Sequence, residues 1–288
     1  MLTILSTAKP FLGHFGVIQR NAITSWTKLD GVEVILFGDD DGTGRICDEL
    51  GLRHVPDIAV NEFGTPLVSD IFARGQALAT QPFCCFINAD IILLPDFIDA
   101  VQRVQAWSDR FFAVGRRRDI DLETNLSFSP DWEDRVRDEA SRGELMSEVW
   151  IDYFLFPTGS IRDMPPFAMG RSAYDNWLIW YAGSLGLSVV DLTPFVTVVH
   201  QRHDYSHGGG KTAVWEGPEA KRQKTMIGDW RHMHGVSHAR YMLAKDGMVV
   251  PSKGLNYRLA RPRRSASHLL RFTRPLRRRL HGERASRK

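Results

Sequence analysis

An aspartate between two apolar runs is the strongest chemical feature of the sequence. Residues 86–93 read FINADIIL, so Asp90 follows a run that is typical of a buried strand and precedes a second apolar run. A carboxylate there is too costly to bury alone, so we expect it to be exposed at a sheet edge, hydrogen-bonded or bound to a cation. An aspartate that caps the following helix or turn is the alternative explanation.

Further acids occupy comparable positions elsewhere in the chain. Three consecutive aspartates, beginning with Asp39 and Asp40, follow Gly38 at the end of the apolar run 32–37. Three acids at that place are also typical of a solvated turn. Asp175 lies in the segment GRSAYDNWLIW, at the start of a predicted helix, where an acid is favourable for electrostatic reasons alone.

Strand and helix signals alternate over the first 115 residues and would position these acids. We expect strands at 2–8, 32–37, 83–87 and 111–114, a short strand near His54, and helices at 15–26, 45–50, 66–80 and 95–107. The strands are largely apolar, which predicts an α/β fold with a mainly parallel sheet flanked by helices on both faces. Ligands bind at the carboxyl ends of strands in such sheets, and Asp39 and Asp90 would both lie at that edge.

The second half of the chain is less regular. A strongly charged segment at 116–148 predicts a surface helix and loops, followed by a strand at 153–156 and a tryptophan-rich helix at 172–184. Strands at 189–190 and 197–199, a Gly- and His-rich stretch and a helix at 218–227 come next. We therefore expect one domain at 1–257, with halves at 1–115 and 116–257, and a separate tail at 258–288.

The composition is that of an ordinary folded protein. Of the 288 residues, 43% are hydrophobic and 25% are charged, which excludes a disordered, collagen-like or disulfide-stapled chain. Three cysteines, two of them in the apolar run PFCCFI, cannot form a disulfide framework and favour a reducing, cytoplasmic setting. We expect neither a secretory signal nor a membrane span.

The charge is distributed unevenly along the chain. Residues 258–288 hold twelve of the 37 basic residues and one of the 34 acids, which leaves 25 basic and 33 acidic residues elsewhere. We expect this basic, amphipathic tail to bind an anionic membrane surface, at about 1 kcal/mol for each basic residue near it. Nucleic acid is less favoured because the rest of the chain is acidic and lacks a recognised reading motif, and a tail without a dedicated partner is the remaining alternative.

Taken in order along the chain, these features resemble the GT-A glycosyltransferases over residues 2–207. The first strand, FGDDDG after the second strand, a helix that contains Arg74, and NADIILLPDF follow one another as in the nucleotide-sugar-binding half of that family. No single motif is specific, so the order of the motifs carries the resemblance. In the family an Asp-x-Asp motif holds a divalent metal on the donor diphosphate, whereas this chain has Asn88-Ala89-Asp90, in which Asp90 alone keeps the charge.

The resemblance implies a Rossmann-type GT-A fold and a site for Mn²⁺ or Mg²⁺ at Asp90. His200, after the strand-like VTVV, occupies the place where similar enzymes complete the coordination, and His203 is the next candidate. His207 and Lys211 would contact phosphate when the Gly-rich segment HDYSHGGGK closes as a lid. The histidine spacings lack HExxH or cysteine partners, so zinc is not indicated, and a solvated loop is the alternative.

The resemblance also implies a set of donor-binding residues. These are Ala8, Lys9, Pro10, Asp39, Asp40, Arg74, Asn88 and Ala89. The first three follow the first strand, where the family cradles the base with backbone groups, and the two acids would meet the base or the ribose. Arg74 would pair with the acid of the metal motif or with the donor. The alternative is that its side chain extends to the surface and leaves the guanidinium in solvent.

Asp175 occupies the place of the general base in inverting relatives, which removes the proton of the acceptor hydroxyl. Asp152, before the strand YFLFP, is a weaker candidate for this role. Trp177 and Trp180 lie close to Asp175 in the sequence, and aromatic faces suit sugar rings, but their helical spacing is more typical of a core.

The implied function is a metal-dependent glycosyltransferase that moves a sugar from a nucleotide diphosphate, with UDP favoured, to a glycan or lipid-linked acceptor. Inversion is slightly favoured over retention, and the tail would bring the enzyme to the inner face of the cell membrane. A sugar-1-phosphate nucleotidylyltransferase fits less well, because LSTAKPFLGHFG has one lysine where that class has a Gly-rich loop with Arg and Lys. A non-catalytic scaffold that binds nucleotide sugars or glycans is the third hypothesis, motivated by Asn88.

Overall fold

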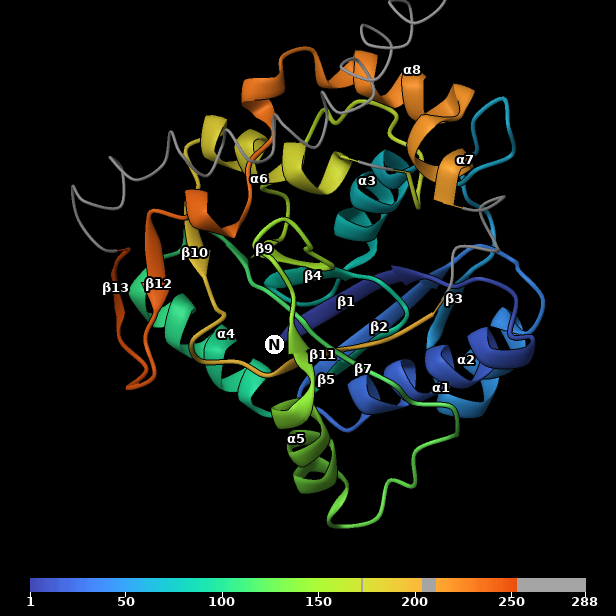
Figure 1. Ribbon diagram of the computed structural model, residues 1–288, viewed down its shortest axis with the longest axis vertical. Helices are drawn as coiled ribbons and strands as arrows, with labels where there is room; N and C mark the ends of the chain where they lie inside the picture. Colours follow the sequence, from blue (N-terminus) through green and yellow to red (C-terminus); the bar gives the residue numbers. More distant parts are fainter. Residues whose placement is uncertain (172, 204–210, 253–288) are drawn as a thin grey trace, which may run out of the picture. The chain divides into compact units, whose positions relative to one another are not determined.

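The structure is a computed structural model that describes residues 1–171, 173–203 and 211–252, of which residues 1–250 form one compact unit. Within the described residues a nine-stranded sheet has the order β13-β12-β10-β6-β9-β4-β1-β2-β3 (Figure 1). Its strands are β1 (Leu2–Thr7), β2 (Val32–Phe37), β3 (Arg53–Val55), β4 (Phe83–Ile87), β6 (Phe111–Val114), β9 (Tyr153–Pro157), β10 (Ser188–Asp191), β12 (Tyr241–Leu243) and β13 (Val249–Pro251).

The sheet is mainly parallel, which confirms the predicted fold class. Strands β4, β1, β2 and β3 are parallel neighbours, as are β6, β10 and β12, while β9 lies antiparallel between β4 and β6. Thr7 pairs with Phe37, and Leu5 pairs with Phe86, so the carboxyl ends of β1, β2 and β4 meet at one edge. The predicted acids that follow β2 and β4 therefore share that edge.

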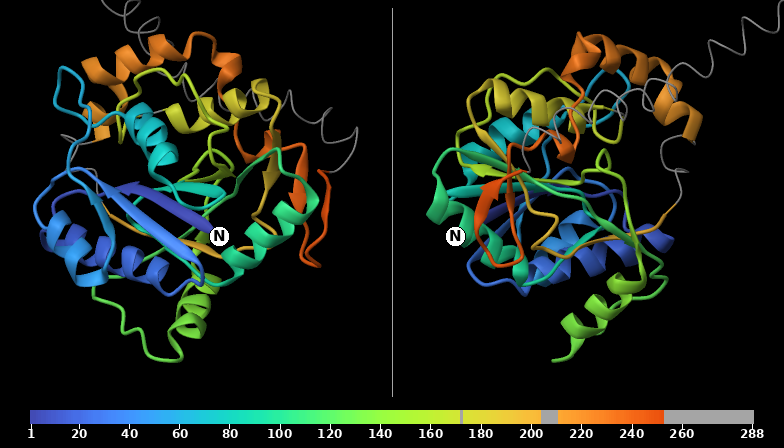
Figure 2. Two further views of the ribbon diagram at one scale, coloured as in Figure 1. Left: turned by 180° about the vertical axis from the view of Figure 1, so that it is seen from behind. Right: turned by 60° about the vertical axis from the view of Figure 1, so that its left-hand side comes forward.

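Helices cover both faces of the sheet (Figures 1 and 2). They are α1 (Gly13–Thr27), α2 (Thr43–Leu50), α3 (Val68–Leu78), α4 (Asp96–Trp107), α5 (Trp132–Arg142), α6 (Tyr174–Ser184), α7 (Lys211–Glu216), α8 (Pro218–Ile227) and the 3-10 helices η2 (Trp230–His232) and η3 (Val236–His238). Alternate side chains of β4 point to opposite faces of the sheet, so Cys85 belongs to the apolar core that includes Trp26 of α1, and Cys84 to the core that includes Phe72 of α3. All three cysteines of the chain are buried and free, as expected of small apolar side chains.

A second, four-stranded sheet was not predicted from the sequence. Its order is β5-β11-β7-β8, formed by β5 (Ile91–Leu93), β11 (Val198–Gln201), β7 (Arg118–Ile120) and β8 (Glu144–Leu145). His200 lies within β11, one residue beyond the predicted strand end, and pairs with Ile91 on one side and Asp119 on the other. This register brings Asp90, His200 and Asp119 next to one another.

Some expectations concern residues that the structure does not describe. The basic tail at 258–288 and His207 lie outside the described residues, and the division of 1–257 into two halves stays a prediction. Among the described residues, no helix combines the length and the apolar character needed to cross a membrane.

Candidate active site

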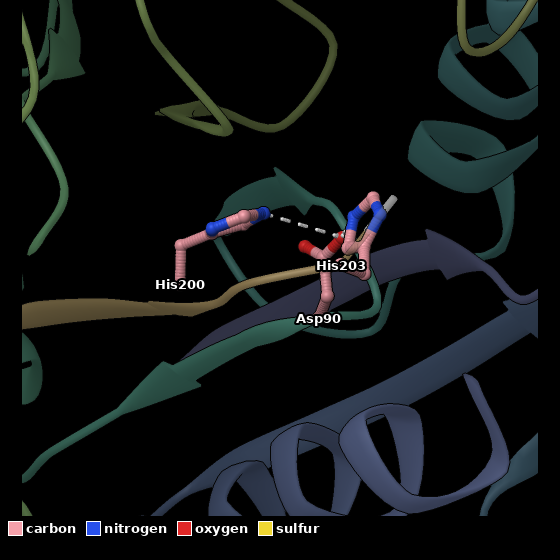
Figure 3. Close-up of side chains that lie close together, drawn as sticks. All are labelled: Asp90, His200 and His203. Atoms are coloured by element: carbon pink, nitrogen blue, oxygen red, sulfur yellow. Dashed lines mark hydrogen bonds and ion pairs between the residues drawn. The ribbon is translucent and has the colours of Figure 1, made fainter. Parts of the chain in front are cut away.

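Asp90, His200 and His203 come together at the carboxyl edge of the large sheet, where the small sheet joins it. Figure 3 shows the two imidazoles on either side of the carboxylate. The His203 Nε2 lies 3.0 Å from Asp90 Oδ2, and His200 Nε2 lies 3.8 Å from the same oxygen. One ligand atom from each residue lies within 4.8 Å of the others, so these three predicted metal ligands form one cluster.

The cluster has the chemistry of a cation site. Asp90 Oδ1 is buried and accepts no hydrogen bond from any described residue. The side chains of Asp90, His200 and His203 are 13%, 8% and 11% exposed, so little water reaches them. A carboxylate oxygen and imidazole nitrogens are ligands that first-row divalent cations accept. An unsatisfied oxygen beside two ring nitrogens therefore fits a bound divalent cation.

Asp90 is held in its charged form. Burial opposes ionisation, but His200, His203 and Lys9 outweigh it and keep the pKa of Asp90 well below its usual range. At neutral pH the site therefore offers a carboxylate, as a cation requires.

A buried network of charged groups extends from this cluster. Arg117 Nη1 donates to Asp152 Oδ2 at 2.5 Å, and Arg117 Nε donates to Asp119 Oδ1 at 2.9 Å. His200 Nδ1 lies 3.2 Å from Asp119 Oδ1. Asn88 Nδ2 donates to Asp152 Oδ1 at 2.8 Å. Sequence reasoning missed both Arg117, which directly precedes β7, and Asp119, which lies within it. Their only signal was a basic and an acidic residue two positions apart, the spacing at which extended backbone directs side chains to the same side.

The loop after β1 holds the predicted donor-binding backbone in place. Lys9 N donates to Gln19 Oε1 at 2.6 Å, and Gln19 Nε2 donates to Lys9 O at 2.9 Å, while Ala8 is buried and Pro10 is exposed. The Lys9 ammonium lies 4.5 Å from the centre of the Phe15 ring and helps to lower the pKa of Asp90. Lys9 is therefore within electrostatic reach of the cation cluster.

The acids after β2 and the alanine of the motif lie where their strands end. Asp39 is exposed and Asp40 half-buried, and burial and the charge of Asp39 raise the pKa of Asp40. Ala89, directly before Asp90 in the sequence, is 7% exposed. The contacts of these residues with a donor stay predictions.

Arg74 has partners other than the predicted acid. Its Nη1 donates to Asp57 O at 2.6 Å and lies 3.2 Å from Asp70 Oδ2, one helical turn earlier. The side chain is 38% exposed, and no described contact joins it to Asp90. The expected pair of Arg74 with the acid of the motif is therefore not observed, because α3 supplies a nearer carboxylate; a contact with a donor stays a prediction.

Asp175 lies in the first turn of α6 and has the electrostatic surroundings of a general base. Ala173 precedes the helix with φ 87°, and Asp175 Oδ1 accepts a hydrogen bond from Asn176 N at 2.9 Å. Burial, together with the charge of Asp152, raises the pKa of Asp175 to about 7, although the hydrogen bond and Arg117 oppose this. A carboxylate with that pKa is matched to proton transfer at neutral pH. Asp152, committed to Asn88 and Arg117, is less available for this role.

The raised pKa of Asp175 predicts a pH-dependent stability. The folded protein binds a proton on Asp175 that the unfolded chain releases, so the free energy of unfolding falls as pH rises from about 4 to about 7. We expect Asp175→Asn to be more stable than wild type at pH 8 by about 2 kcal/mol, since the side chain is half-buried, and equally stable near pH 4. Urea unfolding of both proteins at pH 8 and at pH 4 measures these free energies. A difference between variant and wild type that is equal at the two pH values would contradict the prediction.

The two tryptophans of α6 pack against other aromatic side chains, in keeping with a helical spacing that is typical of core residues. Trp177 is 5% exposed and stacks on Tyr181 with ring centres 4.5 Å apart, and Trp180 stacks on His232 at 3.7 Å. A different aromatic group lies by the network, where the Arg117 guanidinium is 5.4 Å from the Trp150 ring. Sequence reasoning did not identify Trp150. Lys211 is the first residue of α7, but its side chain lies outside what the structure describes.

Solved structures share this fold at low sequence identity. One is glucosyl-3-phosphoglycerate synthase from Mycobacterium tuberculosis in complex with Mn²⁺, UDP-glucose and phosphoglyceric acid, with a TM-score of 0.50, 14% identity, and coverage of 79% of this chain and 80% of that chain. Another is TarS from S. aureus, with a TM-score of 0.46, 12% identity, and coverage of 69% and 60%. No family model matches the sequence, and no curated protein is detectably similar to it. At these identities the likeness establishes the fold alone.

Proposed function

We propose that this chain, which has the fold of the GT-A nucleotide-sugar glycosyltransferases, is a metal-dependent glycosyltransferase. The observation that carries the proposal is the cluster of Asp90, His200 and His203 with a buried, unsatisfied carboxylate oxygen at the ligand-binding edge of the sheet. UDP is the favoured nucleotide, in keeping with the M. tuberculosis enzyme, which was solved with Mn²⁺ and UDP-glucose.

The residues of the cluster would hold Mn²⁺ or Mg²⁺. A divalent cation there would offset the negative charge that grows on the departing diphosphate. Lys9 adds a positive charge close to Asp90 and would act on the same group. The backbone of Ala8, Lys9 and Pro10 would bind the base, and Asp39 or Asp40 the base or ribose.

Asp175 would act on the acceptor. It takes the proton of the acceptor hydroxyl while the acceptor oxygen forms a bond to the anomeric carbon. The bond from that carbon to the diphosphate oxygen breaks, and its electron pair leaves with the diphosphate. A base that serves the acceptor directly implies inversion at the anomeric carbon. His207, in the Gly- and His-rich stretch of the sequence, and Lys211, the first residue of α7, would contact the phosphates.

Calorimetric titration with UDP and GDP, each with and without Mn²⁺, tests the proposal. We expect UDP to bind in the presence of Mn²⁺ and to bind far more weakly without it. Lack of binding under every condition would point instead to a non-catalytic scaffold on the same fold. Release of pyrophosphate from a nucleoside triphosphate and a sugar phosphate would identify a nucleotidylyltransferase.

The basic tail at 258–288 would bring the enzyme to an anionic membrane at the cytoplasmic side, and thus to a lipid-linked or membrane-borne glycan acceptor. Replacing Arg277, Arg278 and Arg279 by Glu in the full chain should lower binding to phosphatidylserine vesicles by at least about 100-fold, at about 1 kcal/mol for each residue. Co-sedimentation with these vesicles and with neutral phosphatidylcholine vesicles measures the effect. Equal binding of the variant and the wild type would contradict the membrane role.

A further inference from the structure

Asn88 occupies the first position of the variant motif and faces an acid. Its Nδ2 donates to Asp152 Oδ1 at 2.8 Å, and its backbone N donates to Asp152 O at 3.0 Å. An aspartate at position 88 would place a second carboxylate within hydrogen-bonding distance of Asp152, and two like charges cannot share such a site without displacement or protonation. The amide is therefore complementary to Asp152 in a way that the family's acid is not.

Asp152 is one end of a chain of buried contacts. Its other oxygen accepts from Arg117, which also donates to Asp119, and the three side chains are 8% to 9% exposed. The Arg117 guanidinium therefore forms ion pairs with two buried carboxylates, those of Asp119 and Asp152. Asn88 donates a hydrogen bond to the remaining oxygen of Asp152 and, being neutral, leaves the net charge of this group of side chains unchanged.

The far end of the chain is His200. Asp119 and His200 are register partners in neighbouring parallel strands, and His200 Nδ1 lies 3.2 Å from Asp119 Oδ1, an electrostatic contact that lacks hydrogen-bond geometry. The negative charge of a carboxylate beside Nδ1 favours a proton on that nitrogen, which leaves Nε2 as the metal-binding atom. In this structure Nε2 is the nitrogen that faces Asp90.

We infer that Asn88 is a positioning residue for the cation site: through Asp152, Arg117 and Asp119 it holds His200 with Nε2 directed at the cation. The inference rests on the proposed function, because it concerns the ligands of that site. Its consequence is that restoring the family's acid with Asn88→Asp weakens metal binding, although it completes the Asp-x-Asp motif.

The experiment compares Mn²⁺ affinity in the full chain, from the electron paramagnetic resonance signal of free Mn²⁺ and from calorimetry with UDP. We expect Asn88→Asp to lower the affinity by about 10-fold to 100-fold, as outer contacts of metal ligands do. The exchange variant Asn88→Asp with Asp152→Asn should recover most of the affinity. In it the amide and the carboxylate trade places, so the net charge, the hydrogen bond between them and an acceptor for Arg117 are all kept.

Two further variants complete the set. Asp119→Asn breaks the network beside His200 and should lower the affinity by a similar factor, with loss of the Nδ1-protonated pattern in the nitrogen chemical shifts of His200. Asp109→Asn, at an exposed site after α4, should leave the affinity unchanged. Circular dichroism melting identifies any variant that fails to fold, and the exchange variant preserves the charge balance if Asn88→Asp alone does not fold.

The outcomes separate the inference from the proposed function. Mn²⁺ affinity in Asn88→Asp equal to or above that of wild type would overturn the inference, as would an exchange variant that binds no better than Asn88→Asp. Absence of Mn²⁺ binding to the wild-type chain, with or without UDP, would overturn the proposed function itself.

Discussion

Replacing Asp90 by Asn is expected to abolish the Mn²⁺-dependent binding of UDP and to lower turnover by about 1,000-fold or more. Asp90 supplies the carboxylate of the cluster, and a divalent cation stabilises the transition state of such a reaction by several kcal/mol. The measurement is calorimetric titration of UDP with Mn²⁺, followed by turnover with a UDP-sugar. The amide keeps the volume of the side chain, so loss of binding would report the charge and not a cavity.

Asp96 provides a matched control for Asp90. Its side chain is 14% exposed, against 13% for Asp90, and its Oδ1 is likewise buried with no partner among the described residues. The other oxygen of Asp96 pairs with Arg137 at 2.7 Å instead of with histidines. Asp96→Asn should therefore change stability but not Mn²⁺ binding. An Asp90→Asn variant that binds UDP with an unchanged metal requirement would rule out the metal role.

Replacing Asp175 by Asn is expected to lower turnover by about 100-fold to 10,000-fold, the range of a general base, with Mn²⁺ and UDP binding retained. The base works only when it is deprotonated, so the wild-type rate should rise with pH and level off above about 7, the pKa of Asp175. The Asn variant should lose this rising limb. Rates from pH 5 to pH 9 at saturating donor measure both effects.

Asp152→Asn distinguishes the two base candidates. The charge of Asp152 helps to raise the pKa of Asp175, so its removal should move the rising limb to lower pH but not erase it. If Asp152 were the base, this variant would lose the limb and Asp175→Asn would keep it. An Asp175→Asn enzyme with the wild-type pH profile would thus contradict the assignment.

The large sheet could be predicted from the sequence because most of its early strands are uninterrupted apolar runs. Strands β2, β4 and β6 have the predicted bounds, since a strand that is buried on both faces needs no alternation. The small sheet could not be predicted in this way. Strand β5 continues the apolar run after Asp90, and β7 lies in a segment whose charges look solvated. Strands of two or three residues carry too little periodicity to be recognised.

The candidate site also contains residues that the sequence predicted and contacts that it could not predict. Asp90 and His200, which the structure brings together, were predicted as ligands because each follows or ends an apolar run in a recognised order of motifs. The ion pair of Arg117 with Asp152 was not predicted, because the two residues lie 35 positions apart and only tertiary packing places the carboxylate beside the guanidinium. The pair of Arg74 with Asp90 is not observed for a local reason: Asp70, four residues earlier, pairs with Arg74 on the helix surface.

The antiparallel strand β9 has a consequence for synthesis of the chain. It completes the hydrogen bonding of β4 along the edge that β1 leaves open, with pairs from Phe83 with Pro157 to Ile87 with Tyr153. Translation delivers β4 first and β9 only after two further helices and several strands. Until then the apolar segment FCCFI presents an unpaired edge of the kind that recruits other chains. Until β9 has been made, a nascent chain is therefore open to association with its neighbours at this strand.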